Sequence, residues 1–238
     1  MQCARTGRDR EDMSGAGRPL DLAWRQARTG DELMRAQAAS RRTRLAPEAR
    51  RNLILDATAA LILEGGLSAV SMERVAVRVA VSKGLIYNYF PTRDALLAAL
   101  LRREQTELRE RGMASALEAR SFEALIRQTT RLYLEQTRDR GAMISALLSD
   151  PSVAALMQDD IRTDRDKTFR YFVQAARREF HLPLELTIAA VDLLSTVTGQ
   201  AGLQVARKQM DVGPATEICV DLILGGLSRL DPGRPLRD

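Results

Sequence analysis

Apolar residues recur at intervals of three and four along most of the chain, which is the period of amphipathic α-helices. The first such segment runs from about Pro47 to Glu64. Proline suits the first turn of a helix, and the Gly65-Gly66 pair is expected to stop it. A linker over residues 67–70 follows. The pattern therefore predicts a helix that ends sharply before the next amphipathic segment.

Two short amphipathic segments between Ser71 and Phe90 are the part of the chain on which its function is expected to depend. They meet at Ala80-Val81-Ser82, with Ser71 placed to N-cap the first segment and Ser82 placed to N-cap the second. Two short helices joined by a tight turn predict a helix-turn-helix, whose second helix enters the major groove of DNA. The second segment is expected to expose Lys83, Tyr87, Asn88 and Tyr89.

Long amphipathic segments make up the remainder of the chain. One is expected to start at Thr92-Arg93-Asp94 and to end near Gly112. Later helices are predicted over residues 121–138, 142–148, 153–180, 183–208 and 214–230. The pattern predicts an all-α protein with a flexible extension (residues 1–45), a three-helix domain (46–93), a C-terminal helical domain (94–230) and a tail (231–238).

Composition and charge support this division. Only 4% of the 238 residues are aromatic and β-branched runs are scarce, which favours helices over strands. Residues 41–103 hold 11 Lys and Arg against 5 Asp and Glu, a net charge of +6, whereas residues 104–238 hold 18 against 20, a net charge of −2. Because the positive charge is concentrated around the helix-turn-helix, a polyanion is the expected partner there.

The sequence offers little for other classes of function. Cys3 and Cys219 are too far apart to suggest a disulfide framework or a metal site. There is no apolar run before Trp24 that would predict a secretory signal, and no window approaches the apolar length of a membrane span. We therefore expect a soluble cytoplasmic protein with no membrane partner.

Charged clusters in the helical segments are interpreted as surface pairs. Glu104, Glu107 and Glu110 alternate with arginines, as on a solvated helix face. Four aspartates, interleaved with Arg and Lys, are interpreted in the same way and not as a metal site: Asp159, Asp160, Asp164 and Asp166. Without paired histidines, a phosphate loop or a nucleophile-base set, we expect no metal, no cofactor and no enzyme activity.

The N-terminal extension admits two interpretations. In the first, it is a passive tail, or even a stretch included because the start of the chain was assigned too early, with Met13 or Met34 as the real beginning. Alternatively, its basic end forms an arm that reaches phosphate or an A·T-rich minor groove through Arg41, Arg42 and Arg44.

The segment from Ile54 to Leu101 resembles the N-terminal DNA-binding domain of the TetR family of transcriptional regulators. The resemblance rests on an ordered set of features at the family's spacing: Ile54-Leu55-Asp56-Ala57, Gly66, Ser71, Ala76, Val81-Ser82, Lys83-Gly84, Tyr87, Phe90 and Thr92-Arg93-Asp94. Val70 and Leu85 depart from it, because each removes a hydroxyl that the family often has. Ala80 replaces a common glycine, so the turn either needs no positive φ or carries slight strain.

The resemblance implies roles for individual residues of the recognition helix. Lys83 would meet phosphate or a guanine edge, and Gly84 would let the backbone approach DNA closely. Tyr87 and Tyr89 would reach phosphates or a thymine methyl group, although Tyr87 is alternatively a core residue. Asn88 would read adenine or is simply solvated. The remaining predicted contacts lie at helix N-termini, where N–H groups favour phosphate: Ser71, Ser82 and Arg93.

For the C-terminal domain, the resemblance implies a small-molecule effector site and a dimer interface formed by the last two helices. The segment from Ser195 to Gly202 is rich in small residues, and the last helix carries Ile218, Leu222 and Leu227 on an apolar face. The candidates for the effector site, each of which is alternatively plain core, are Tyr133, Gln136, Met143, Phe169, Phe172 and Gln200.

The expected function is that of a homodimeric repressor, which a small-molecule ligand releases from a palindromic operator on double-stranded DNA. The rival hypothesis is a helical protein-interaction module in which DNA binding is weakened or lost, as the departures at Val70, Ala80 and Leu85 would allow.

Overall fold

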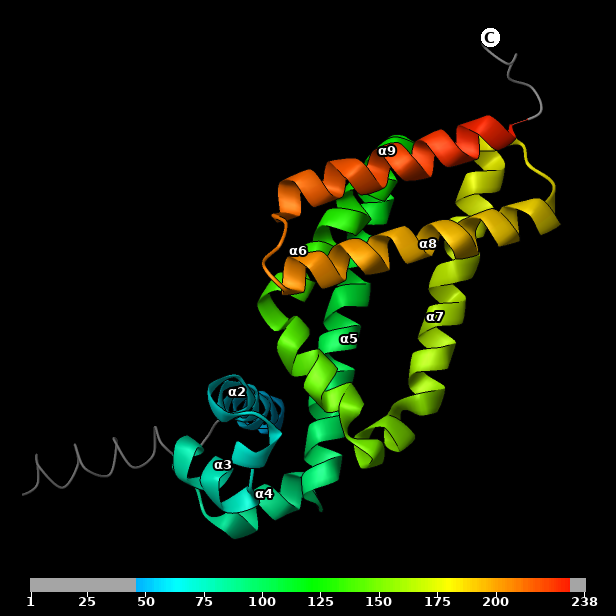
Figure 1. The fold of residues 1–238 in the computed structure, drawn as a ribbon. Coiled ribbons are helices and arrows are strands. Elements are labelled where there is room, and N and C mark those ends of the chain that lie inside the picture. Colours follow the sequence, from blue (N-terminus) through cyan, green and yellow to red (C-terminus); the bar gives the residue numbers. More distant parts are fainter. Residues whose placement is uncertain (1–45, 232–238) are drawn as a thin grey trace, which may run out of the picture. The chain divides into compact units, whose positions relative to one another are not determined.

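The protein is described by a computed structural model, in which residues 46–231 are placed. Over this range the chain forms eight α-helices and one 3₁₀ turn, without a β-strand (Figure 1). The elements are α2 (Pro47–Gly65), η1 (Leu67–Ala69), α3 (Met72–Val79), α4 (Lys83–Tyr89), α5 (Arg93–Glu118), α6 (Phe122–Ser149), α7 (Pro151–Phe180), α8 (Leu184–Ala206) and α9 (Val212–Leu230). The prediction of an all-α fold is confirmed.

Contacts between residues divide the chain into two units, residues 1–50 and residues 51–238. Of the first unit, the structure describes only residues 46–50, which begin α2. The predicted extension over residues 1–45, with Arg41, Arg42 and Arg44, therefore lies outside the described residues, as do residues 232–238. The boundary predicted between residues 93 and 94 stays a prediction.

Helices α2 to α5 share one hydrophobic core. Its fully buried side chains include Ile54 of α2, Val75 of α3, Ile86 of α4 and Leu97 of α5. Phe90, at the C-terminal end of α4, is buried with them, as predicted. Because each short helix contributes one apolar face to this core, its opposite face is left toward solvent.

Side-chain caps set the start of most of these helices. The hydroxyls of Ser71 and Ser82 accept the backbone N–H groups of Arg74 and Leu85, both at 3.2 Å. The other side-chain caps accept N–H groups at 3.0–3.3 Å and belong to Thr92, Ser121 and Asp150. A cap satisfies N–H groups that have no partner inside the helix, so these short polar residues fix where each helix begins.

Two helices continue through glycines at places where the sequence predicted that a helix would end. α5 continues through Gly112 to Glu118, and α6 is a single helix through Gly141, where two helices were predicted. A glycine in a helix costs only about 1 kcal/mol relative to alanine, which flanking helix formers and packing can outweigh. The last helix also begins two residues before Pro214, since proline is tolerated in a first turn.

The turn between α3 and α4 has a defined hydrogen-bond pattern. The N–H of Ala80 bonds to the carbonyl of Val77 at 3.1 Å, and the N–H of Val81 bonds to the carbonyl of Ala76 at 3.0 Å. This pattern is a Schellman motif, which places its central residue in the left-handed region. Ala80 has a φ of 56°, so a positive φ is required and the residue carries strain.

The C-terminal helices pack around a second core. α6 contacts α5, α8 and α9, and it lies across α8 and α9 in Figure 1. The rings of Phe122 and Phe180 meet edge to face with centroids 5.3 Å apart, which joins the start of α6 to the end of α7. Around them the core contains Leu125, Ala190, Ile223 and Leu227.

One helix of the described range, α8, is long and apolar enough to cross a membrane by length and composition alone. The expectation that no segment approaches this length is therefore wrong. Only part of α8 faces the core, and Leu193, on another side, is 69% exposed. An apolar surface of this kind needs a covering partner, and a membrane is only one of the possible partners.

Replacing Ala80 with glycine tests the strain in the turn. Glycine adopts a positive φ without a clash, so the Ala80→Gly variant should gain about 0.5–1 kcal/mol in the free energy of unfolding, measured by urea titration. Ala114, exposed within α5, is the matched control. Ala114→Gly should lose about 1 kcal/mol, and an equal loss at both positions would contradict the strain.

Candidate nucleic-acid interface

The helix α4 presents one apolar face and one polar face. Ile86 is fully buried, whereas Lys83, Gly84 and Asn88 are exposed and Tyr87 is 42% exposed. This exposure excludes the interpretation of Tyr87 as a core residue. A Cβ atom on Gly84 would meet no other atom within 4 Å, so the backbone is open to solvent at that point. The exposed face has the residue types that meet phosphates and base edges in a major groove.

Lys83 has two neighbours on this surface. Its ammonium group forms an ion pair with the carboxylate of Glu73 in α3, and it lies 5.7 Å from the ring centre of Tyr87. The hydrogen bond with Lys83 lowers the pKa of Glu73, and the same bond raises the pKa of Lys83. Both groups are therefore charged at neutral pH. No pattern in the sequence connected Glu73 with the recognition helix.

Other residues predicted to contact DNA have partners inside the protein. The guanidinium of Arg93 donates to the carbonyl oxygens of Val70 at 3.0 Å and Leu67 at 2.9 Å. It also lies 3.7 Å from the carboxylate of Asp150. Tyr89 is half-buried and packs against the core. Arg93 therefore holds the loop before α3, and its predicted phosphate contact remains untested.

Two of the departures from the family pattern, Val70 and Ala80, leave the geometry of the helix-turn-helix intact. Val70 is buried in the core and Leu85 is half-buried. A hydroxyl at position 70 would therefore face the core, and only position 85 loses a group near the surface. Ala80 adopts the conformation that glycine would adopt there.

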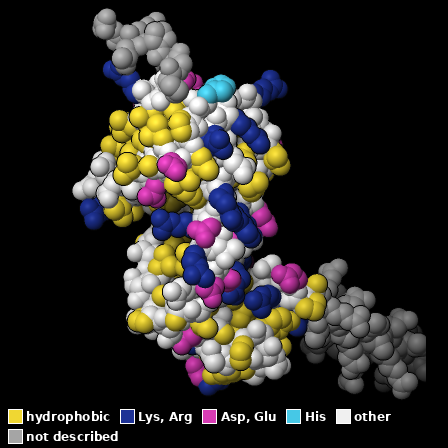
Figure 2. Space-filling view, turned by 90° about the vertical axis from the view of Figure 1, so that its right-hand side faces the viewer, with side chains coloured by type: hydrophobic (Ala, Val, Ile, Leu, Met, Phe, Trp, Pro, Cys, Tyr) yellow, Lys and Arg dark blue, Asp and Glu magenta, His cyan; other side chains and the backbone are white. Residues whose placement is uncertain are grey.

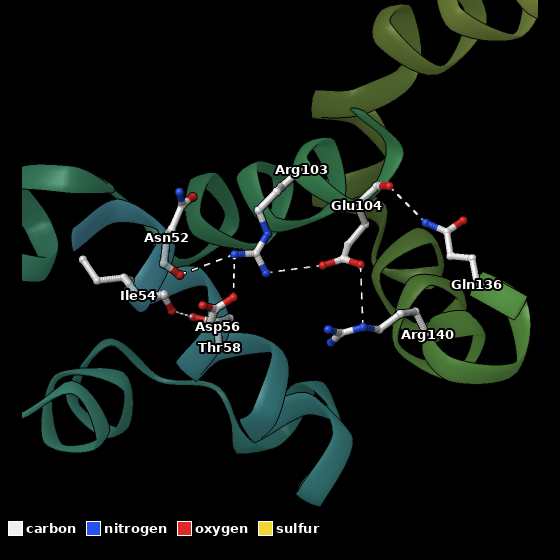
Figure 3. Close-up of polar contacts among 8 residues, drawn as sticks. All are labelled: Asn52, Ile54, Asp56, Thr58, Arg103, Glu104, Gln136 and Arg140. Carbon is white, nitrogen blue, oxygen red and sulfur yellow. Dashed lines mark hydrogen bonds and ion pairs between the residues drawn. The ribbon is translucent and has the colours of Figure 1, made fainter. Parts of the chain in front are cut away.

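The prediction that Glu104 lies on a solvated helix face is wrong, because this residue is only 3% exposed. Its carboxylate lies 3.3 Å from Arg103 and 3.9 Å from Arg140, and its carbonyl oxygen accepts a hydrogen bond from Gln136 at 3.0 Å (Figure 3). Arg103 in turn pairs with Asp56 at 2.7 Å. This Glu104 cluster joins α2, α5 and α6 through polar contacts.

Three of the four aspartates interpreted as paired charges form ion pairs, two of them with α5. Asp160 pairs with Arg102 at 2.7 Å and Asp164 pairs with Arg109 at 2.7 Å, so α7 is connected to α5. Asp159 pairs with Arg162 within α7. Figure 2 shows acidic and basic side chains interspersed across the middle of the displayed face. The described residues contain no group of three or more His, Cys, Asp or Glu suited to a metal.

The six candidates for an effector site do not form one cluster. Met143 is buried in the core shared with α2 to α5, Phe172 packs against the second core, and Tyr133 packs against a third cluster near Gly202. Tyr133 and Met143 are ten residues apart in one helix, which separates them by about 15 Å along its axis. Gln136 belongs to the Glu104 cluster, Gln200 is exposed and Phe169 is half-buried. The effector site stays a prediction.

Comparison with known proteins decides the family. Residues 54–100 match the sequence model described as bacterial regulatory proteins, tetR family. The transcriptional repressor KstR of Rhodococcus jostii is 33% identical over 189 residues, which cover 77% of this chain and 87% of that protein. The chain belongs to the TetR family. KstR of Mycobacterium tuberculosis is 29% identical over 68% of this chain and 78% of its own length.

Solved structures agree on the fold. A TetR-like regulator from Rhodococcus sp. RHA1 has a TM-score of 0.62 at 19% identity, over 78% of this chain and 99% of that chain. Salmonella enterica GusR also has a TM-score of 0.62, at 20% identity, over 77% of this chain and 97% of its own.

Membership of the family confirms the predicted class of function. The TetR-family chain is a DNA-binding transcriptional regulator. Regulators of this family are soluble, usually dimerise and bind small-molecule effectors, and are generally not enzymes.

Removing the charge of Glu104 tests whether the cluster stabilises the fold. A Glu104→Gln variant removes the carboxylate that Arg103 and Arg140 share, and since both arginines keep some contact with solvent, the free energy of unfolding should fall by about 1 kcal/mol in a denaturant titration. Glu107→Gln is the control, because Glu107 is exposed on the same helix. Equal stability of the two variants would show that the buried pairs contribute little.

Proposed function

We propose that this chain is a homodimeric, cytoplasmic repressor that binds a palindromic operator and is released from it by a small-molecule effector. The observation that carries the proposal is the exposed face of α4, where Lys83, Tyr87 and Asn88 project from a helix whose other face is fixed by Ile86 and Phe90. Relatives from three bacteria are named transcriptional repressors, which supports repression as the direction of control.

The surface of α4 that is available to contact bases is small. α4 has only seven residues, so few side chains can reach base edges at once. With Arg93 bonded internally and Tyr89 half-buried, contact with bases falls mainly to Lys83, Tyr87 and Asn88. Ser71, Ser82 and Gly84 lie at or near helix N-termini, where backbone N–H groups favour phosphate. The short recognition helix therefore requires a second copy to specify a long operator.

The apolar faces of α8 and α9 support a dimer. The exposed large apolar residues of these helices include Leu193, Leu203, Ile218 and Leu222. The two helices lie side by side in Figure 1 and pack closely, since a Cβ on Gly226 of α9 would lie 3.2 Å from Leu194 of α8. A second copy that covers this face would remove its apolar surface from water.

A two-fold dimer explains why the operator would be palindromic. Two copies of α4 related by a two-fold axis would enter successive major grooves when they are about 34–36 Å apart. Any change in the angle between the two copies alters this distance. Affinity for the operator therefore depends on the dimer geometry that α8 and α9 set.

The Glu104 cluster supplies a physical connection for effector control. α5 carries Arg103 toward α2 and Glu104 toward α6, so a shift of α6 is transmitted to α2 by adjacent residues of one helix. An effector that binds among the C-terminal helices can shift the equilibrium only by its differential affinity for the two arrangements.

The rival hypothesis, a module that has lost DNA binding, has less support. Val70 is buried and Ala80 adopts the required left-handed conformation, so two of the three departures that suggested it leave the helix-turn-helix intact.

DNA binding is tested with duplexes from upstream of the chain's own gene, by footprinting and fluorescence anisotropy at several salt concentrations. Lys83→Ala and Tyr87→Ala should each weaken specific binding about tenfold or more. If Lys83 contacts a phosphate, its loss should also reduce the salt slope by about 1. Lys167→Ala, on α7, is the control and should bind like the parent. Selective binding unchanged in the Lys83 and Tyr87 variants would contradict the proposal.

The dimer interface is tested by placing a charge on its apolar face. Leu222→Glu should weaken dimerisation by about 2 kcal/mol or more, roughly thirtyfold, measured by light scattering over a concentration series. Leu117 is 83% exposed on α5, so Leu117→Glu is the matched control. Dissociation by Leu117→Glu and not by Leu222→Glu would place the interface elsewhere.

A further inference from the structure

Glu73 is an acidic residue on a surface that the proposed function brings against DNA. It lies in the first turn of α3, and its carboxylate contacts the ammonium group of Lys83, the first residue of α4. A carboxylate beside the recognition helix is repelled by phosphates, and the segment around it is otherwise basic. Its position therefore needs a reason beyond general attraction to DNA.

A role in helix stability does not by itself account for the contact with Lys83. An acidic residue in the first turn of a helix interacts favourably with the helix dipole wherever its side chain points. Here the carboxylate interacts with Ser71 and with its own backbone at the start of α3, and it also contacts the ammonium group of Lys83 in the next helix. That ammonium group lies 5.7 Å from the ring centre of Tyr87. Because the two charged groups are in contact, a group that approaches the ammonium of Lys83 also comes near the carboxylate of Glu73.

The chemistry of Lys83 permits both contacts at once. An ammonium group has three N–H donors, so one can serve Glu73 while another meets a guanine N7 or O6 atom. A carboxylate has about four acceptor sites, so that of Glu73 keeps one beside its interactions with Lys83, Ser71 and its own backbone. In the major groove, the amino group of cytosine is the donor that a glutamate recognises, and it lies beside the guanine acceptors of the same base pair.

We propose that Glu73 is a specificity-determining residue of the operator contact: it holds the Lys83 ammonium group and accepts a hydrogen bond from a cytosine amino group, so that the pair favours a C·G base pair in each half-site. This inference rests on the proposed function, in which the α4 surface reads DNA. Glu73 thereby lowers affinity for other sequences, since a wrong base pair leaves its charge beside phosphates without a donor.

The test compares base preferences of the full-length chain and its variants. Duplexes are selected from a randomised pool by the parent and by Glu73→Gln, Glu73→Ala, Lys83→Ala and Glu64→Gln proteins, and the affinities of single-position operator variants are then measured. Glu64 is the matched control, because it is 58% exposed against 57% for Glu73 and is paired with Arg78 instead of Lys83. A thermal melt of each variant reports whether it is folded.

The parent should prefer C·G at one position of each half-site by about tenfold or more. Both Glu73 variants should lose this preference and bind unrelated DNA more tightly, whereas Glu64→Gln should retain it. Retention of the preference by Glu73→Ala, its loss in Glu64→Gln, or a preference for another base pair at that position would overturn the inference. If the parent itself selects no sequence, the proposed function fails instead.

Discussion

The buried leucines of α5 are the constraint on which the rest of the structure depends. Leu96, Leu97, Leu100 and Leu101 are fully buried, and they pack in one core with residues from α2, α3 and α4 on one hand and from α6 and α7 on the other. Removing these side chains from water is worth about 2 kcal/mol each, so the first turns of α5 cannot easily separate from either group of helices. The recognition helix is therefore held on an element that the C-terminal helices also hold.

Polar contacts continue this connection one turn further along α5. Arg103 bonds to α2 and Glu104 is buried beside α6, so neighbouring residues of one helix face two different parts of the fold. A buried carboxylate is tolerated only when it is paired, and its partners must then keep their places. Such a cluster has few alternative arrangements, which suits the proposed control of DNA binding by an effector through α5.

The apolar faces of α8 and α9 show why composition alone does not decide what covers a helix. α8 satisfies the length and hydropathy of a membrane span, yet part of it packs against the core with α6 and α9. The neighbouring helix α9 also exposes large apolar residues, such as Ile218 and Leu222. In the proposed dimer a second copy would offer the same surface and cover both helices together, which fits a family whose members usually dimerise.

Local signals in the sequence determined the helices, their caps, the helix-turn-helix and the exposure of Lys83 and Asn88, because each depends on residues within a few positions of one another. Helix continuity through Gly112 and Gly141 was not predictable in this way, since packing outweighs a small local cost. The burial of Glu104, the internal bonds of Arg93 and the pairing of Glu73 with Lys83 were decided only by the tertiary structure. Their partners are distant in the sequence or lie across a turn, so no periodicity along the chain records them.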